Sequence, residues 1–133
     1  MDIRKSINDH LKLQEKCLQL SKKILESCKK DDLDLLISLT ENRERLLSTL
    51  SHLYQNIDHQ LNLLSAESIT PDLILFLKEW QSKMIKLSHE ITLIDEDTLV
   101  KLEENKDSVA IEISKIFKQK ENLKGYDLSS VKR

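Results

Sequence analysis

The chain has 133 residues and a formal net charge of −2; charged residues make up 33% of it, and aromatic residues only 4%. It contains one glycine and one proline, which argues against sheets joined by tight turns and against glycine-rich phosphate loops, since both depend on residues that adopt positive φ. We therefore predict an all-α protein, an elongated antiparallel helical bundle of three to four helices, with a single domain over residues 1–126 and a disordered tail over residues 127–133.

The first predicted helix covers about residues 2–30. Its apolar side chains occupy roughly half of the helix circumference, so it should contact two other helices rather than one. They form one edge of Ile3, Ile7, Leu11, Leu18 and Leu25 and another of Leu13, Cys17, Leu20, Ile24 and Cys28. The two cysteines lie about 16 Å apart along such a helix, too far for a disulfide, so we expect free, buried thiols in a reducing compartment.

The second predicted helix covers about residues 33–64. It follows a turn at residues 29–32, in which either Asp31 or Asp32 serves as the N-cap. Its apolar residues repeat every three to four positions, which is typical of bundle packing, with a polar interruption at residues 40–45. The repeat consists of Leu36, Leu39, Leu46, Leu47, Leu50, Leu53, Tyr54, Ile57, Leu61 and Leu64.

The third predicted helix begins after a break at residues 65–71, where Thr70 is the expected N-cap and Pro71 the first helical residue. Its main apolar stripe consists of Leu73, Leu77, Trp80, Met84, Leu87, Ile91 and Ile94. The register slips after Ile94, so either one long helix spans residues 72–124 or a bend falls near residues 95–97. Gly125 is expected to end the helix.

A second strip of Ile74, Ile85 and Leu99 lies about 100° from this main stripe. It is either the edge of a wide core or a surface that faces a partner. Trp80 has the same two interpretations, because a single tryptophan in an apolar stripe packs in a core or anchors a binding partner.

No residue pattern points to catalysis, a cofactor or a metal. The histidines His10, His52, His59 and His89 lack the spacing of helical metal ligands, and we expect them at the surface or at its boundary. The acidic residues Asp95, Glu96, Asp97, Glu103 and Glu104 are expected on a solvated helix face, where carboxylates gain no perturbed pKa. We therefore predict a binding protein and not an enzyme.

Charge and hydropathy limit the location and the partners. The basic and acidic residues give net charges of +4 over residues 1–30, −5 over 31–69, −4 over 70–104 and +3 over 105–133, which sum to −2. This distribution favours antiparallel packing of the terminal helices on the central ones and argues against a nucleic-acid partner. The longest apolar run, residues 73–77, is far shorter than a membrane span of about 20 residues, and no export signal opens the sequence, so we expect a cytoplasmic protein.

Two segments resemble FliT-type flagellar export chaperones. Residues 33–47 are similar to the "Leu-Leu-x-x-Leu-x-x-x-Arg-x-x-Leu-Leu" segment of that family, with Arg43 at its arginine. Residues 91–95, which read Ile-Thr-Leu-Ile-Asp, and the charged helix after them resemble the second half of the family. The ordered set of Arg43, Asp95, Lys120 and Tyr126 is the specific part, although Gly125 precedes the tyrosine where the family motif reads Ala-Tyr-Gly.

The resemblance implies a function. Such chaperones hold the C-terminal region of the filament-cap protein in the cytosol before type III export and hide its hydrophobic helix; in some members the C-terminal helix folds back over the binding groove. Some also contact the export ATPase complex. We expect the partner-binding groove on the second and third helices and a lid formed by residues 102–123. The groove residues predicted are Leu53, Tyr54, Ile57, Leu61, Ile74, Leu77, Trp80, Met84 and Ile85.

Two alternatives stay open at the level of sequence. The chain could be another secretion chaperone, of the hook-junction (FlgN-like) or virulence type III kind, because these share its length and helicity. It could also be a structural coiled-coil adaptor that forms a homodimer through the stripe over residues 73–94.

Overall fold

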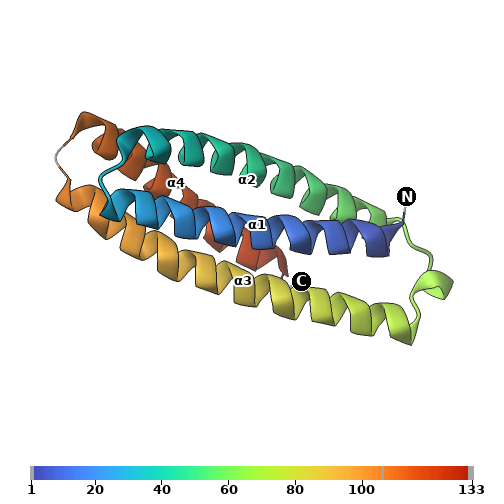
Figure 1. Cartoon of the computed structure of the whole chain (residues 1–133). Helices are drawn as coiled ribbons and strands as arrows, with labels where there is room; N and C mark the ends of the chain where they lie inside the picture. Colours follow the sequence, from blue (N-terminus) through green and yellow to red (C-terminus); the bar gives the residue numbers. More distant parts are fainter. Residues whose placement is uncertain (1, 106, 132–133) are drawn as a thin grey trace.

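The computed structural model of the chain describes residues 2–105 and 107–131, with side chains for residues 2–105 and 107–119. Four antiparallel helices form an elongated bundle (Figure 1): α1 (Ile3–Lys29), α2 (Leu33–Asn62), α3 (Pro71–Glu104) and α4 (Ser108–Val131). A 3₁₀ turn, η1 (Ala66–Ser68), connects α2 to α3, and no strand occurs among the described residues. The predicted all-α antiparallel bundle is confirmed.

Helix α1 packs against both α2 and α3, as its wide apolar face predicts. In the described part of the chain, the α2 and α3 backbones do not approach each other closely, and the two helices meet only through long side chains. Helix α4 packs mainly on α3 and to a smaller extent on α2, and in Figure 1 it runs behind α1, on the other side of the bundle. The pair α2 and α3 is therefore held together from two sides, by α1 and by α4.

Side-chain caps set the starts of the first three helices. The carboxylate of Asp2 accepts a hydrogen bond from the backbone N–H of Arg4, at 3.0 Å. Asp32 and Thr70 cap α2 and α3 in the same way, each accepting from the N–H three residues ahead at 3.2 Å. Pro71 then occupies the first turn of α3.

The tight turn between α1 and α2 forms without a glycine. Asp31 takes a φ of 54°, in the left-handed region that aspartate and asparagine visit more readily than other non-glycine residues. The next residue, Asp32, is then free to cap α2, which decides between the two N-caps that the sequence left open. At the other end, α2 finishes at Asn62, two residues before the predicted end.

The third predicted helix is two helices, and both interpretations of residues 72–124 were wrong. One helix ends at Glu104 and the next begins at Ser108, so the interruption does not fall near residues 95–97; the side chains of Asn105 and Asp107 compete there for the helical backbone. Asn105 Oδ1 accepts from the N–H of Asp107 at 2.9 Å, and Asp107 Oδ1 accepts from the N–H of Val109 at 2.8 Å. The second of these bonds caps the start of α4.

Helix α4 also extends beyond its predicted end at Gly125, as far as Val131. A single glycine inside a helix costs only about 1 kcal/mol relative to alanine, so it weakens a helix without ending it. Residues 127–131, which we predicted to be a disordered tail, therefore belong to α4, and residues 132 and 133 lie outside the described residues.

The core is divided into three clusters along the bundle. The hairpin cluster, beside the α1–α2 turn, contains Ile24, Leu36, Leu39, Leu102, Ala110, Ile113 and Phe117. The middle cluster contains Cys17, Leu18, Leu50 and Ile91. The terminal cluster, near η1, contains Ile7, Ile57, Trp80 and Met84, with half-buried Ile3, Leu11, Leu53, Tyr54, Leu61, Phe76 and Leu77 around them.

The predictions about the second apolar strip and the cysteines are confirmed only in part. Ile74 and Ile85 are exposed, at 41% and 42%, whereas Leu99 is half-buried against the hairpin cluster, so the predicted second strip holds for two of its three members. Neither cysteine is part of a disulfide; Cys17 is buried and Cys28 is half-buried. None of the described helices combines the length and apolar character needed to cross a membrane.

Candidate partner-binding site

The structure gathers seven of the nine predicted partner-binding residues in the terminal cluster. Three of them, Ile57, Trp80 and Met84, are buried at 0%, 8% and 8% exposure and form the interior of the bundle. Four are half-buried: Leu53, Tyr54, Leu61 and Leu77. The remaining two, Ile74 and Ile85, lie on the exposed surface of α3. The nine residues therefore do not form one open groove in this conformation, and Trp80 is a core residue.

Trp80 is fixed by an aromatic contact that the sequence did not predict. Its indole Nε1–H donates a hydrogen bond to His10 Nδ1 at 3.2 Å, and the two rings meet edge-on at 89°. The ring of Tyr54 lies 5.8 Å from that of Trp80 and 5.9 Å from that of His10. Edge-on and tilted pairs at these distances are favourable, so one residue from each of α1, α2 and α3 meets here.

His10 corrects our expectation that the histidines lie at or near the surface, because it is buried at 5% exposure. Burial lowers its pKa from 6.5 to about 4. The ring is thus neutral at pH 7, with Nδ1 accepting from Trp80 and the proton on Nε2. The spacing of Ile7, His10, Gln14 and Cys17 places His10 on the apolar face of α1, and this signal could have identified it.

A second polar contact attaches α1 to α3 next to this cluster. The side-chain amide of Gln14 is buried, and its Nε2 donates to the backbone carbonyl of Met84 and to Ser88 Oγ, both at 3.0 Å. Because buried polar groups are costly unless they are hydrogen-bonded, these contacts fix the position of α3 along α1.

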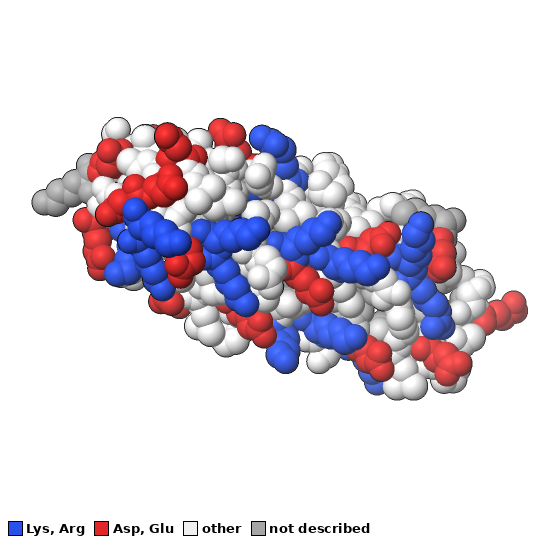
Figure 2. Space-filling model, in the orientation of Figure 1, with Lys and Arg blue, Asp and Glu red and all other residues white. Residues whose placement is uncertain are grey.

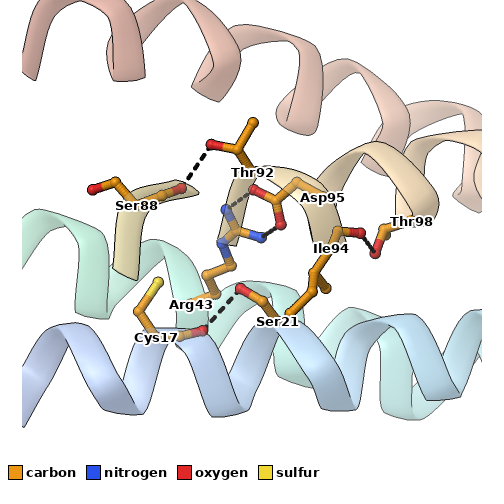
Figure 3. Close-up of polar contacts among 8 residues, drawn as sticks. All are labelled: Cys17, Ser21, Arg43, Ser88, Thr92, Ile94, Asp95 and Thr98. Atoms are coloured by element: carbon orange, nitrogen blue, oxygen red, sulfur yellow. Dashed lines mark hydrogen bonds and ion pairs between the residues drawn. The ribbon is translucent and has the colours of Figure 1, made fainter. Parts of the chain in front are cut away.

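An ion pair is buried between α2 and α3 under α4 (Figure 3). Arg43 donates from Nη1 and Nη2 to the two carboxylate oxygens of Asp95, at 2.6 Å each, and both side chains are 3% exposed. The ring of Phe117 from α4 covers the pair, 4.7 Å from Arg43 Cζ. This parallel, two-bond geometry is the strong form of an arginine–carboxylate contact.

Electrostatics favour the charged form of this pair. Burial alone would lower the pKa of Arg43, but the hydrogen bond and charge of Asp95 outweigh burial and raise it. Our prediction that Asp95 lies on a solvated acidic face was wrong, because Arg43 compensates its burial. The family resemblance singled out both residues, yet it did not predict their contact; Lys120 and Tyr126 of the same set lie outside the described side chains.

Helix α4 does not cover the predicted site residues with its described side chains. Ala110, Ile113 and Phe117 pack into the hairpin cluster, at the opposite end of the bundle from the terminal cluster. On the surface, Lys118 forms an ion pair with Glu103 of α3 at 3.5 Å. Leu102, the first residue of the predicted lid, belongs to α3. A lid over the terminal cluster is therefore not formed by the described side chains of α4.

A strip of apolar surface remains at the terminal cluster, where α1 holds α2 and α3 and no described α4 side chain packs. We call it the terminal seam and define it by five half-buried or exposed residues of the predicted site on α2 and α3: Tyr54, Leu61, Ile74, Leu77 and Ile85. The three α3 members follow positions i, i+3 and i+11, which lie close together on one side of a helix.

A surface depression lies elsewhere, at the α1–α2 turn and the end of α3. It has a volume of about 620 Å³ and is lined by Cys28, Lys29, Asp31, Lys101, Glu104 and Asn105. Burial and the charge of Asp31 raise the pKa of the Cys28 thiol to about 11, so the thiol is protonated at pH 7 and is a poor nucleophile. Among the described residues, no group of histidine, cysteine and acidic side chains is arranged to hold a metal ion.

Comparison of the chain with protein-family models, with curated protein sequences and with solved structures found no match.

Proposed function

We propose that this protein is a helix-binding chaperone of the FliT-like type, which holds the C-terminal helical region of an export substrate in the cytosol before type III export. The observation that carries the proposal is the apolar surface of the terminal seam, where Ile74 and Ile85 are 41% and 42% exposed. At the terminal cluster, α2 and α3 are held from one side by α1, while the described side chains of α4 pack at the opposite end.

An amphipathic helix of another protein is the natural occupant of such a surface. Amphipathic helices bind hydrophobic grooves through residues at i, i+3, i+4 and i+7, and the terminal seam offers apolar side chains from two helices for such contacts. The exposed fractions of Ile74 and Ile85 give a bound helix apolar area to bury, at about 25 cal/mol per Å². The substrate we propose is the filament-cap protein, as the family resemblance implies.

Helix α4 has a regulatory role in this proposal. It lies next to α2 and α3, the helices that would hold the substrate, and its described part buries few large apolar side chains. A substrate helix that extends from the terminal seam towards the hairpin cluster would compete with α4 for the same two helices. Contact with the export ATPase complex would then depend on whether α4 is docked or displaced.

The bundle argues against the coiled-coil adaptor and does not distinguish between the types of secretion chaperone. The adaptor interpretation needs the α3 stripe over residues 73–94 as a dimer interface, but Leu73, Trp80, Met84 and Ile91 are buried within the monomer. A homodimer would have to use another surface. A FlgN-like or virulence chaperone would use the same surface with a different substrate, so substrate identity distinguishes it.

We expect purified protein to bind the C-terminal segment of the filament-cap protein of its own host. Changing Ile74 and Ile85 together to glutamate should weaken binding more than about tenfold, since each apolar side chain buried by the substrate stabilises the complex by about 1.5–3 kcal/mol. Isothermal titration calorimetry gives the affinities, and Leu63→Glu, at a residue 71% exposed outside the seam, is the matched control. Equal affinities for the two variants would contradict the proposed surface, and no binding to the cap segment would contradict the proposed substrate.

A further inference from the structure

The outward face of α1 carries a line of lysines. At about 100° per residue, all five fall within about 20° of one line, with spacings of 7, 4, 7 and 7 residues, over a length of about 38 Å. They are Lys5, Lys12, Lys16, Lys23 and, at the C-cap, Lys30. All five are exposed, and Figure 2 shows basic side chains following one another along this face of the molecule. We call this line the lysine stripe.

The charges of the lysine stripe are not neutralised within the protein. Among the described side chains, none of the five lysines lies within 4.0 Å of a carboxylate, whereas Lys29, off the line, pairs with Glu26 at 3.9 Å. The molecule as a whole has a net charge of −2. A concentration of positive charge along one helix, in a protein that is slightly acidic overall, points to a partner of opposite charge.

We propose that the lysine stripe binds an acidic helix of a second protein that lies along α1. A helix that runs beside another presents one face with repeats of seven and of three or four residues, and the spacings of the stripe are of this kind. Glutamate or aspartate at matching positions of the partner would face successive lysines over about seven turns. The stripe consists of lysine without arginine, so each position offers a single point charge rather than a rigid two-bond fork.

The composition of the stripe argues against nucleic acid and against a membrane surface. Single-stranded nucleic acids are bound with aromatic side chains that stack on bases, and interfacial helices insert large apolar side chains; the stripe positions carry neither. Two exposed acids, Asp9 and Glu26, flank the line and would repel a continuous polyphosphate or anionic lipid surface. A protein helix can place a basic residue opposite each of them.

The stripe is independent of the terminal seam. Helix α1 packs on α2 and α3 through its other face, so the lysines point away from the side where α4 lies. A partner on the stripe and a substrate helix at the seam could therefore be bound together.

Three labelled probes test the proposal by fluorescence anisotropy at 50 mM and 300 mM salt. The first is a helical peptide with glutamates spaced 7, 4, 7 and 7 residues, with a scrambled peptide of the same composition as its reference. The other two are a 20-base-pair DNA duplex and vesicles with anionic lipid. The test variant combines Lys12→Glu, Lys16→Glu and Lys23→Glu. The control variant combines Lys78→Glu, Lys83→Glu and Lys86→Glu, at lysines that are exposed on α3. Circular dichroism confirms that both variants are folded.

We expect the patterned peptide to bind more tightly than the scrambled peptide, and high salt to weaken this binding. The α1 variant should lose about tenfold or more in affinity for the patterned peptide, whereas the α3 control should lose little. The proposal is overturned if the two peptides bind equally, if both variants lose the same affinity, or if no peptide binds at 50 mM salt. Tighter binding of the duplex or of the vesicles, with the same dependence on the α1 lysines, would overturn it in favour of that class of partner.

Discussion

Asp95→Ala is expected to lower the free energy of unfolding by about 3–5 kcal/mol, because it leaves the guanidinium of Arg43 buried without its counter-charge. Both side chains are 3% exposed and are joined by two hydrogen bonds of 2.6 Å. Urea denaturation followed by circular dichroism measures the change. Asp97→Ala, two residues away on the exposed surface of α3, is the matched control and should change stability by no more than about 0.5 kcal/mol.

A double variant distinguishes the stability lost with the ion pair itself from the stability lost when one charge stays buried without a partner. Replacing both partners with apolar residues of similar size, as in Arg43→Met with Asp95→Leu, should recover most of the lost stability, because no unpaired charge remains in the core. If Asp95→Ala costs no more than Asp97→Ala, the carboxylate is not buried against Arg43, and the packing of α2, α3 and α4 described above is wrong.

Acidification should destabilise the protein through His10 by about 3 kcal/mol between pH 7 and pH 4. The pKa of His10 is about 4 in the folded protein and about 6.5 in the unfolded chain, so the unfolded chain binds the proton first. The stabilisation from a neutral His10 is complete above pH 6.5 and is lost as the pH falls from 6.5 to 4. Carboxylates also titrate in this range, so the measured quantity is the difference between wild type and His10→Gln.

Glutamine keeps an acceptor for the indole N–H of Trp80 but does not titrate. Urea denaturation at pH 7 and at pH 4, followed by the fluorescence of Trp80, gives the free energies of unfolding, and His89→Gln, at an exposed histidine, is the control. The His10→Gln protein should lose about 3 kcal/mol less than wild type and than the control. The same loss in all three proteins would show that His10 is solvated or already charged at neutral pH.

Local signals in the sequence were sufficient to predict where each of the first three helices begins. Thr70 followed by Pro71, and Asp32 before an apolar repeat, are short-range patterns whose effect on the backbone does not depend on the rest of the fold. The break at Asn105 and Asp107 is also local, but it was missed because it interrupts an apolar stripe that continues on both sides of it. Competition by asparagine and aspartate side chains outweighed the periodicity there.

The polar core could not be predicted from periodicity. Arg43 and Asp95 are 52 residues apart, and each alone reads as an exposed charge on its own helix. Burial becomes favourable only when the fold brings the two together, which is a property of tertiary packing. His10 is different, because its position on the apolar face of α1 was visible in the sequence and its residue type led to the wrong prediction.

The candidate site was predicted as an open groove, whereas most of its residues form a partly buried cluster. The apolar repeats of the second and third predicted helices identified the residues that meet at one end of the bundle, and seven of nine do meet there. Periodicity shows which face of a helix is apolar, yet it does not show which neighbour covers that face. Trp80 is covered by α1, whereas Ile74 and Ile85 are not covered in the described structure.

The most direct test of the account is to place a photo-crosslinking amino acid at Ile74 in the terminal seam and, as a control, at Leu63 outside it. Crosslinked products formed in the host cell are digested, and the joined peptides are identified by mass spectrometry. The account predicts that position 74 crosslinks to the C-terminal helical region of an exported flagellar protein and that position 63 does not. Crosslinks from position 74 to this chain alone, or to the same proteins as position 63, would contradict it.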